Sequence, residues 1–397
     1  MVTYDNLVPK INPNIDIVQR DNEYIVTLIE SNFHFKISTQ MFNLLKLVDN
    51  DSKISQIVNR FNNTFETQLD NALVYELLYY KLGRYNIIEN NENNFDVKKQ
   101  PSYLKLNFIV INAKRAKILS KPFLFLFSNY ALKFLISVCL LITSITFITN
   151  YNEILKNVKS ISVEYFTFYF VIMIISSLFH ELGHVSATYK FGGSHSGIGI
   201  GFYLFTPVLY ADVSSAWKFN VNKRIIVNLA GIYFELLLST FFIIISFLTT
   251  IKPLLIVPSI ILFKTIYNLN PFFRTDGYWV LSDYIRTPNL RERSNKLLKN
   301  MIKNRFSLQL NSKEIFIFFY ALISNSFLLL FLFYLFILNP NSLISFPADI
   351  YSYASKIVKE SASFKISDVS KLLVPLLFYM LVIRLLFNYF KNKKQKK

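Results

Sequence analysis

The sequence predicts a mostly α-helical membrane protein, a bundle of six membrane-spanning helices preceded by a small N-terminal α+β domain. Long apolar runs begin after residue 123, and only 17% of all residues are charged, whereas soluble domains average about 25%. The first hundred residues are mixed and polar, without the short apolar stretch near Met1 that a cleavable signal peptide requires. Cys139 is the single cysteine, so an intrachain disulfide is excluded.

Residues 1–97 are expected to form a cytoplasmic, winged-helix-like domain. Apolar and polar residues alternate in three short stretches separated by polar turns, a pattern that is typical of β-strands. Three stretches with helical spacing follow, and Ser, Thr or Asp residues suited to capping precede two of them. The strands are expected at 15–18, 24–29 and 33–37, the helices at 40–48, 53–62 and 67–82, and a further strand or wing at 84–95.

The net charge of +18 belongs to the membrane part of the chain. Residues 1–100 contain 10 Lys and Arg against 13 Asp and Glu, whereas the remainder contains 33 against 12. The N-terminal domain therefore lacks the basic face that phosphate binding needs, and nucleic acid is not expected as a partner. Residues 98–127 form a basic linker with interleaved apolar residues, which indicates a segment on the membrane surface with lipid as its partner.

Six segments are each long and apolar enough to cross roughly 30 Å of hydrocarbon. Basic residues are concentrated in the loop 286–313 and in the C-terminal tail, and this bias marks the cytoplasmic side of a membrane. We therefore expect a multi-pass protein of the cell membrane with both termini in the cytoplasm. The spans are expected at 128–150, 163–187, 224–249 and 254–278, which form a catalytic core over 128–285, and at 314–338 and 370–390, which lie in the C-terminal region 314–397.

The second expected span ends in the motif His180-Glu181-Leu182-Gly183-His184. Because the two histidines are four residues apart, a helix places both imidazoles on one face, where they can reach a single ion. Zinc-dependent hydrolysis needs two such imidazoles, an adjacent carboxylate as general base and an open position for water. Ionisable groups inside a membrane are costly and usually functional, which favours a metal site over a polar packing face.

A third metal ligand is expected from the fourth span. The second and fourth spans run in the same direction, so Asp276 is expected at the same depth in the membrane as His180. Pro271 and Gly277 would interrupt the helix there, and broken helices at membrane depth are tolerated where they line a site in the protein. The alternative is that Asp276 only caps a helix end.

These two motifs together resemble the site-2 protease family of intramembrane zinc metallopeptidases. That family combines HExxH with a motif of the form N-x-x-P-x-x-x-x-D-G, which this chain matches from Asn268 to Gly277. The resemblance implies a site-2-protease-like core in which His180, His184 and Asp276 hold Zn²⁺. It also implies that Glu181 is the general base.

One stretch of the chain differs from the family pattern, and two others are similar to one subgroup of the family. Where the family often has A-G-P-x-x-N on the next span, this chain has Ile232 in place of Pro and Glu235 in place of Asn. The stretches FYLFTPVLYADVSSAWKF and NPFFRTDGYWVLSDYIRTPNLRERS are similar to a subgroup, the peptide zinc metalloproteases. That subgroup is associated with the maturation or export of ribosomally made peptides.

The resemblance implies a zinc-dependent intramembrane endopeptidase that processes a peptide or a membrane-associated precursor. Asn268 is a candidate catalytic residue that donates to the substrate backbone or to the oxyanion, with capping of the broken helix as its alternative role. Two other functions remain open. One is a regulated protease that releases a membrane-tethered regulator, and the other is a non-catalytic zinc-binding partner in peptide export. The sequence does not indicate an oligomeric state.

Residues 192–213 are unusually apolar for a cytoplasmic loop and are expected to form a hairpin that re-enters the membrane. Glycines alternate in its first half, and its second half is extended in character. An extended peptide substrate could add as a strand to such an edge, since hydrolysis needs an unwound backbone. The candidate substrate-binding residues are Gly199, Gly201, Tyr203 and Phe205, and the alternative is a hairpin that only plugs the cavity.

Two further charges are expected to pair inside the membrane. Glu235 lies about ten residues into the third span and Lys264 about ten residues into the fourth, and at roughly 1.5 Å per residue both reach mid-bilayer. An unpaired charge there would cost several kcal/mol. His195 is expected to be a loop residue, and His34 is expected to be structural.

The N-terminal domain has two candidate roles. It could be a peptide-recognition module, since its fold is expected to resemble the leader-peptide-binding elements of peptide-modifying enzymes, which capture peptides along a strand edge. No residue motif carries this analogy, which rests on the expected fold alone. The alternative is a structural domain without a ligand.

Overall fold

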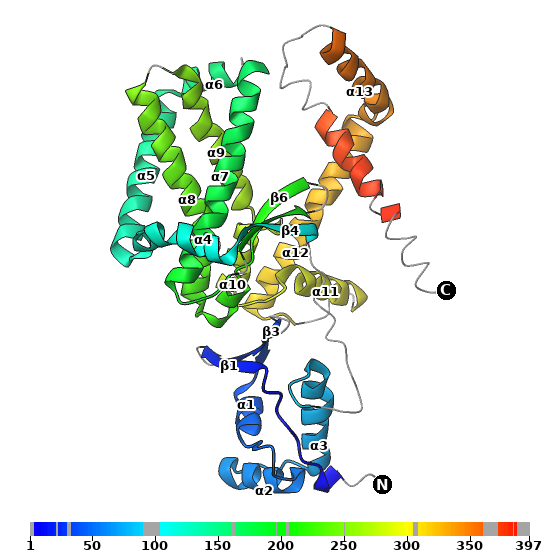
Figure 1. Ribbon diagram of the computed structural model, residues 1–397. Coiled ribbons are helices and arrows are strands. Elements are labelled where there is room, and N and C mark those ends of the chain that lie inside the picture. Colours follow the sequence, from blue (N-terminus) through cyan, green and yellow to red (C-terminus); the bar gives the residue numbers. More distant parts are fainter. Residues whose placement is uncertain are drawn as a thin grey trace. The chain divides into compact units, whose positions relative to one another are not determined.

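The computed structural model divides the chain into two compact units (Figure 1). The first consists of Met1–Ala113 and Thr188–Arg224, and the second of Lys114–Ala187 and Ile225–Lys397. The structure describes residues 4–20, 23–29, 33–89, 104–159, 163–195, 197–203, 206–249, 251–304, 309–359, 372–383 and 385–386.

The first unit begins with a three-stranded antiparallel sheet in the order β1-β2-β3. The strands are β1 (Ile15–Arg20), β2 (Glu23–Leu28) and β3 (Phe33–Ile37), as the alternating pattern predicts. Val26 and Ile37 are buried and belong to the core that the sheet shares with the following helices. Burial of these apolar side chains fixes the register, because a shift by one residue would turn them to solvent.

The helices that follow the sheet are those that the sequence predicts. They are α1 (Thr39–Lys46), α2 (Ile54–Phe65) and α3 (Asn71–Tyr75), which continues as the π-helical segment Glu76–Leu82. Ser38 caps α1, since its side chain accepts a hydrogen bond from the Met41 amide at 3.2 Å.

Of the strand or wing expected at 84–95, the structure describes only the first part. Gly83–Tyr85 forms a 3₁₀ turn, and Ile88 makes an isolated antiparallel bridge to Ile11. Residues 90–95 lie outside the described part of the chain.

A second antiparallel sheet, in the order β4-β5-β6, also belongs to the first unit. The predicted hairpin forms β5 (Gly197–Tyr203) and β6 (Thr206–Ala211). Its partner β4 (Leu104–Asn112) comes from the basic linker, where the sequence analysis expected only a membrane-surface segment. A Cβ atom at position 199 would lie 2.7 Å from the Phe108 carbonyl oxygen and from the Tyr210 ring, so glycine permits this close pairing.

The second unit is helical, and four helices are long and apolar enough to cross a membrane. The candidate spans are Asn129–Thr149 (α5), Thr167–Lys190 (within α7, Val163–Lys190), Val221–Leu248 (α8) and Ser312–Leu338 (α12, Ser312–Phe333, with the π-helical segment Tyr334–Leu338). These correspond to the first, second, third and fifth expected spans. The last residues of α7 and the first residues of α8 belong to the first unit.

The other two expected spans are shorter in the described part of the chain. The fourth is the 13-residue helix α9 (Ile256–Asn268), and the sixth is described as an apolar helix at Leu372–Ile383. A fold with six spans therefore remains a prediction.

The remaining helices are α4 (Ala113–Ser120), a 3₁₀ segment (Lys121–Phe127), α6 (Tyr151–Lys159), a 3₁₀ turn (Lys252–Leu255), α10 (Asp276–Tyr284), α11 (Leu290–Lys303) and α13 (Asn341–Lys359).

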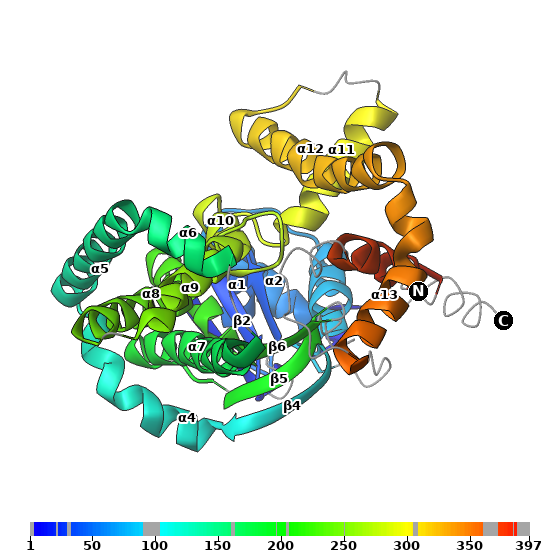
Figure 2. The same ribbon diagram turned by 90° about the horizontal axis from the view of Figure 1, so that it is seen from above.

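Helices α7, α8 and α9 run side by side (Figures 1 and 2). Tyr169 and Ile172 of α7 pack with Val257 and Ile261 of α9, and side chains of α8 cover this cluster. A Cβ atom at Gly183 would lie 2.4 Å from the Ala230 carbonyl oxygen, so glycine allows the backbones of α7 and α8 to approach closely.

His34 makes the stability of the N-terminal sheet dependent on pH. Thr27 Oγ1 lies 2.9 Å from its Nδ1. Burial, followed by the positive charge of Lys218, lowers the pKa of His34 from 6.5 to about 4. Between these pH values an unfolded chain binds a proton that the folded protein does not, so the free energy of unfolding decreases as the pH falls from 6.5 to about 4.

We expect His34→Gln to weaken this pH dependence, because glutamine does not titrate. Amide hydrogen exchange in β2 and β3, corrected for intrinsic rates, measures the effect in the full-length protein. Asn63→Gln, at an exposed position on α2 that does not titrate, is the control and should retain the wild-type slope. Equal slopes in wild type and His34→Gln would contradict this assignment.

Candidate metal centre

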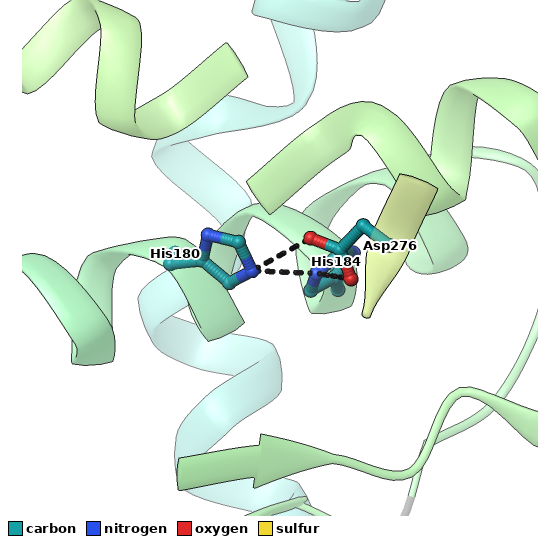
Figure 3. A group of neighbouring side chains, drawn as sticks. All are labelled: His180, His184 and Asp276. Atoms are coloured by element: carbon teal, nitrogen blue, oxygen red, sulfur yellow. Dashed lines mark hydrogen bonds and ion pairs between the residues drawn. The ribbon is translucent and has the colours of Figure 1, made fainter. Parts of the chain in front are cut away.

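Helix α7 supplies two histidines that lie one turn apart on the same face. Both side chains are buried, with less than a tenth of their surface exposed. Their Nε2 atoms lie 3.1 Å apart. The helical spacing of the motif therefore brings His180 and His184 together as predicted, with both rings directed to one point (Figure 3).

Asp276 completes the group from the first residue of α10. Its Oδ2 lies 3.0 Å from Nε2 of His180, and its Oδ1 lies 3.5 Å from Nε2 of His184. Figure 3 shows the carboxylate facing both rings. Within the described part of the chain, these three side chains form the one group of His, Cys, Asp or Glu whose atoms converge closely enough to hold a metal ion.

The break between α9 and α10 sets the position of this aspartate. A Cβ atom on Gly277 would lie 2.0 Å from the carbonyl oxygen of Leu269, so only glycine lets the start of α10 approach the end of α9 this closely. The Asn270 side chain accepts a hydrogen bond from the Phe272 amide at 2.9 Å, and the Tyr320 hydroxyl donates to the Pro271 carbonyl at 3.0 Å. These contacts satisfy backbone groups that the break leaves without helical partners.

Each histidine ring also has a polar neighbour on the side away from the other two ligands. Nδ1 of His184 lies 2.7 Å from the Val227 carbonyl oxygen, which can only accept, so Nδ1 carries the proton. Nδ1 of His180 lies 3.1 Å from Oε1 of Glu235, an ion-pair distance, although neither atom makes a hydrogen bond within the described residues. With its proton on Nδ1, the neutral His184 ring has a free lone pair on Nε2, as metal ligation requires.

This arrangement fits zinc. Two nitrogen lone pairs and a carboxylate converge, and Oδ2 of Asp276 is buried without a hydrogen bond in the described residues. Ligand atoms around a tetrahedral zinc ion, at about 2.0–2.1 Å from it, lie about 3.3 Å from one another. The Nε2–Nε2 separation of 3.1 Å is close to that spacing, one oxygen of Asp276 lies 3.0 Å from Nε2 of His180, and the other lies 3.5 Å from Nε2 of His184. A divalent cation offsets the repulsion between these electron-rich atoms, and the donor set of two nitrogens and one oxygen suits zinc.

Helix α8 leaves room for the His180 ring through Gly231. A Cβ atom at this position would lie 2.4 Å from Nε2 of His180. Any larger residue would displace the ring or the helix, since real atoms do not approach that closely. The small residue is therefore a steric requirement of the metal centre.

The predicted ion pair of Glu235 and Lys264 is present. Lys264 Nζ lies 2.7 Å from Oε1 of Glu235, and the hydroxyl of Thr265 donates to Oε2 at 2.9 Å. The contact between Glu235 and His180 was not predicted. The sequence feature that could have indicated this contact is the spacing on α8. Glu235 lies four residues, about one helical turn, after Gly231, and Gly231 faces the His180 ring.

The remaining candidate residues lie where their segments place them, but their roles stay predictions. Glu181 is half-buried and follows His180 on α7, and Asn268 is the last residue of α9. Neither belongs to the converging metal group, and neither does His195, which precedes β5. The three candidate substrate-binding residues Gly199, Gly201 and Tyr203 lie on β5, and Phe205 lies outside the described residues.

The fold and the site define a helical protein with candidate membrane spans and a buried His-His-Asp group that fits zinc. No protein-family model matches the chain, and no solved structure matches it. The chain is similar to YydH of Bacillus subtilis (strain 168), whose name describes it as a peptide zinc metalloprotease. The two are 25% identical over 225 residues, which cover 53% of this chain and 84% of YydH. This match confirms the resemblance that the motifs indicate and supports a zinc-dependent protease.

We expect Gly231→Ala to reduce zinc affinity at least tenfold, because the added methyl group overlaps the His180 ring and over-packing of this kind also strains the helices. Competition with a chelator of known zinc affinity measures the dissociation constant of the purified, membrane-inserted protein. Ile244→Ala, at an exposed position on the same helix, is the control and should bind zinc normally. Full zinc occupancy at wild-type affinity in Gly231→Ala would show that the ring does not occupy this space.

Proposed function

We propose that the chain is a zinc-dependent endopeptidase of the membrane, with His180, His184 and Asp276 holding the metal. The observation that carries this proposal is the convergence of the three side chains, which each offer one ligand atom within 4.8 Å of the others. The similarity to a protein named as a peptide zinc metalloprotease supports the reaction class.

The catalytic role falls to Glu181. A zinc ion at this site would supply Lewis acidity and lower the pKa of water towards about 7. Glu181 would take the proton of the attacking water and return it to the leaving amine, so that one carboxylate acts first as base and then as acid. Asn268, at the end of α9, would donate a hydrogen bond to the substrate backbone or to the oxyanion.

The proposed substrate is a peptide or membrane-associated precursor, with a ribosomally made peptide as the favoured class. The name of YydH contains the word peptide, which supports this class. The strand β6 is an edge of its sheet, and an extended peptide could pair there through main-chain hydrogen bonds. Residues on β5, including Gly199, Gly201 and Tyr203, would then shape the binding surface, together with Phe205. The N-terminal domain is proposed as a further peptide-recognition module.

The proposed location is the cell membrane, with six spans and both termini in the cytoplasm. Four helices of suitable length and apolarity support a membrane location. The basic loop 286–313 and the basic tail support the proposed orientation, because positive residues remain on the cytoplasmic side.

We expect Glu181→Gln to lower the cleavage rate by about 10²- to 10⁴-fold, the usual contribution of a general base, while zinc content is unchanged. Mass spectrometry of peptides that accumulate in cells producing Glu181→Gln would identify the substrate, and its cleavage by purified protein would give the rate. Glu153→Gln, at an exposed position on α6, is the matched control. Wild-type cleavage by Glu181→Gln would rule out this mechanism.

Zinc content tests the ligand assignment separately. His180→Ala and Asp276→Ala are expected to fall from roughly one zinc per chain to little or none, because three protein ligands are the usual minimum of a catalytic zinc site. Retention of a full zinc equivalent in both variants would place the metal elsewhere.

The topology can be tested with single cysteines in a Cys139→Ser background. Cysteines introduced at Tyr4 and at Lys397 are expected to react with an impermeant maleimide only from the cytoplasmic side of sealed vesicles. Labelling of the two positions from opposite sides would require an odd number of spans.

A further inference from the structure

A continuous line of polar contacts crosses three helices behind the metal centre. Lys264 of α9 contacts Glu235 of α8 at 2.7 Å, and the same oxygen of Glu235 lies 3.1 Å from Nδ1 of His180 on α7. The line ends at Nε2 of His180, which faces Asp276. An ion pair buried between helices therefore reaches a metal-ligating ring on the side opposite the metal.

Both charged groups have polar partners within the helix bundle. The Glu235 side chain has no exposed surface, and its second oxygen accepts a hydrogen bond from Thr265 at 2.9 Å. Lys264 Nζ also lies 2.9 Å from the Ser177 hydroxyl and 3.4 Å from that of Ser176. Helix α9 thus holds the carboxylate through an ion pair at Oε1 and a hydrogen bond at Oε2, while Oε1 has no hydrogen bond within the described residues.

Stability alone does not account for this ion pair. Replacing a buried ion pair by apolar residues of similar volume is often neutral or stabilising, so such a pair is weak evidence of a structural role. The contact with His180 supplies a different reason. Metal-ligating histidines commonly donate their second ring nitrogen to a carboxylate, and this contact fixes both the tautomer and the orientation of the ring.

We propose that Glu235 is a positioning residue that accepts the Nδ1 proton of His180 and so presents Nε2 to zinc, and that Lys264 holds Glu235 in place. This inference rests on the proposed zinc site. Lys264 also neutralises the carboxylate, so the pair orients the ring without adding net charge beside the metal. Asp276 then supplies the negative charge on the metal side.

Two charge-neutral double variants test this role. Glu235→Gln with Lys264→Met keeps an oxygen that can accept from Nδ1, whereas Glu235→Leu with Lys264→Met removes it and leaves a similar volume. Neither variant leaves an unpaired charge in the helix bundle. Zinc dissociation constants are measured by competition with a chelator on protein that is monodisperse in detergent.

We expect the Gln–Met variant to bind zinc about 10- to 100-fold more tightly than the Leu–Met variant, the usual effect of a partner behind a metal ligand. A merely structural pair would give equal affinities in the two double variants, and that result would overturn the proposal. Nitrogen NMR of His180 in the zinc-loaded wild type is a second measurement that needs no variant. It should show the proton on Nδ1 and zinc on Nε2, and zinc on Nδ1 would also overturn the proposal.

The same experiments separate this inference from the proposed function. If wild-type protein binds zinc and loses it in Asp276→Ala, the zinc site stands whatever the double variants show. If the wild type binds no zinc, the proposed function fails, and the role of Glu235 fails with it.

Discussion

The structure depends on the convergence of two imidazole nitrogens and one carboxylate between buried helices. All three groups are electron-rich on the sides that face one another, and separations of 3.0–3.5 Å are unfavourable without a cation between them. A divalent cation between the three groups would attract each of them, so that their close approach becomes favourable. The helix packing, the interrupted fourth segment and the polar contacts behind His180 can each be understood as the means by which the fold holds these groups in that arrangement.

Close helix packing is the second condition for the site. Gly183 brings the backbone of α7 against α8, and Gly231 leaves the space that the His180 ring fills. Lipid tails are as apolar as the side chains they would replace, so helices in a membrane associate largely through close packing and interhelical hydrogen bonds. In the second unit, the same contacts that hold the helices together also bring the ligands within reach of one ion.

The sequence predicts the parts of the structure that depend on local periodicity. The i, i+4 spacing placed His180 and His184 on one face, and apolar length identified α5, α7, α8 and α12. Asp276 was predictable because its motif combines a carboxylate with Pro and Gly. The pairing of β4 with β5 was not, because its two strands are separated by more than eighty residues and no local pattern encodes that partner. The contact of Glu235 with His180 likewise depends on how α7 and α8 are rotated against each other, which charge and spacing alone do not specify.

The hydrogen bond between the Tyr320 hydroxyl and the Pro271 carbonyl connects the metal centre to a helix that contributes no ligand. Helix α12 thereby contacts the irregular segment between α9 and α10, on which the position of Asp276 depends. The Tyr320 ring also stacks on Phe272 of the same segment. Amino-acid changes on α12 can accordingly alter the geometry of the ion site from a distance. The smallest assembly that preserves the site therefore includes α12 together with α7 and α10, which carry the three candidate ligands.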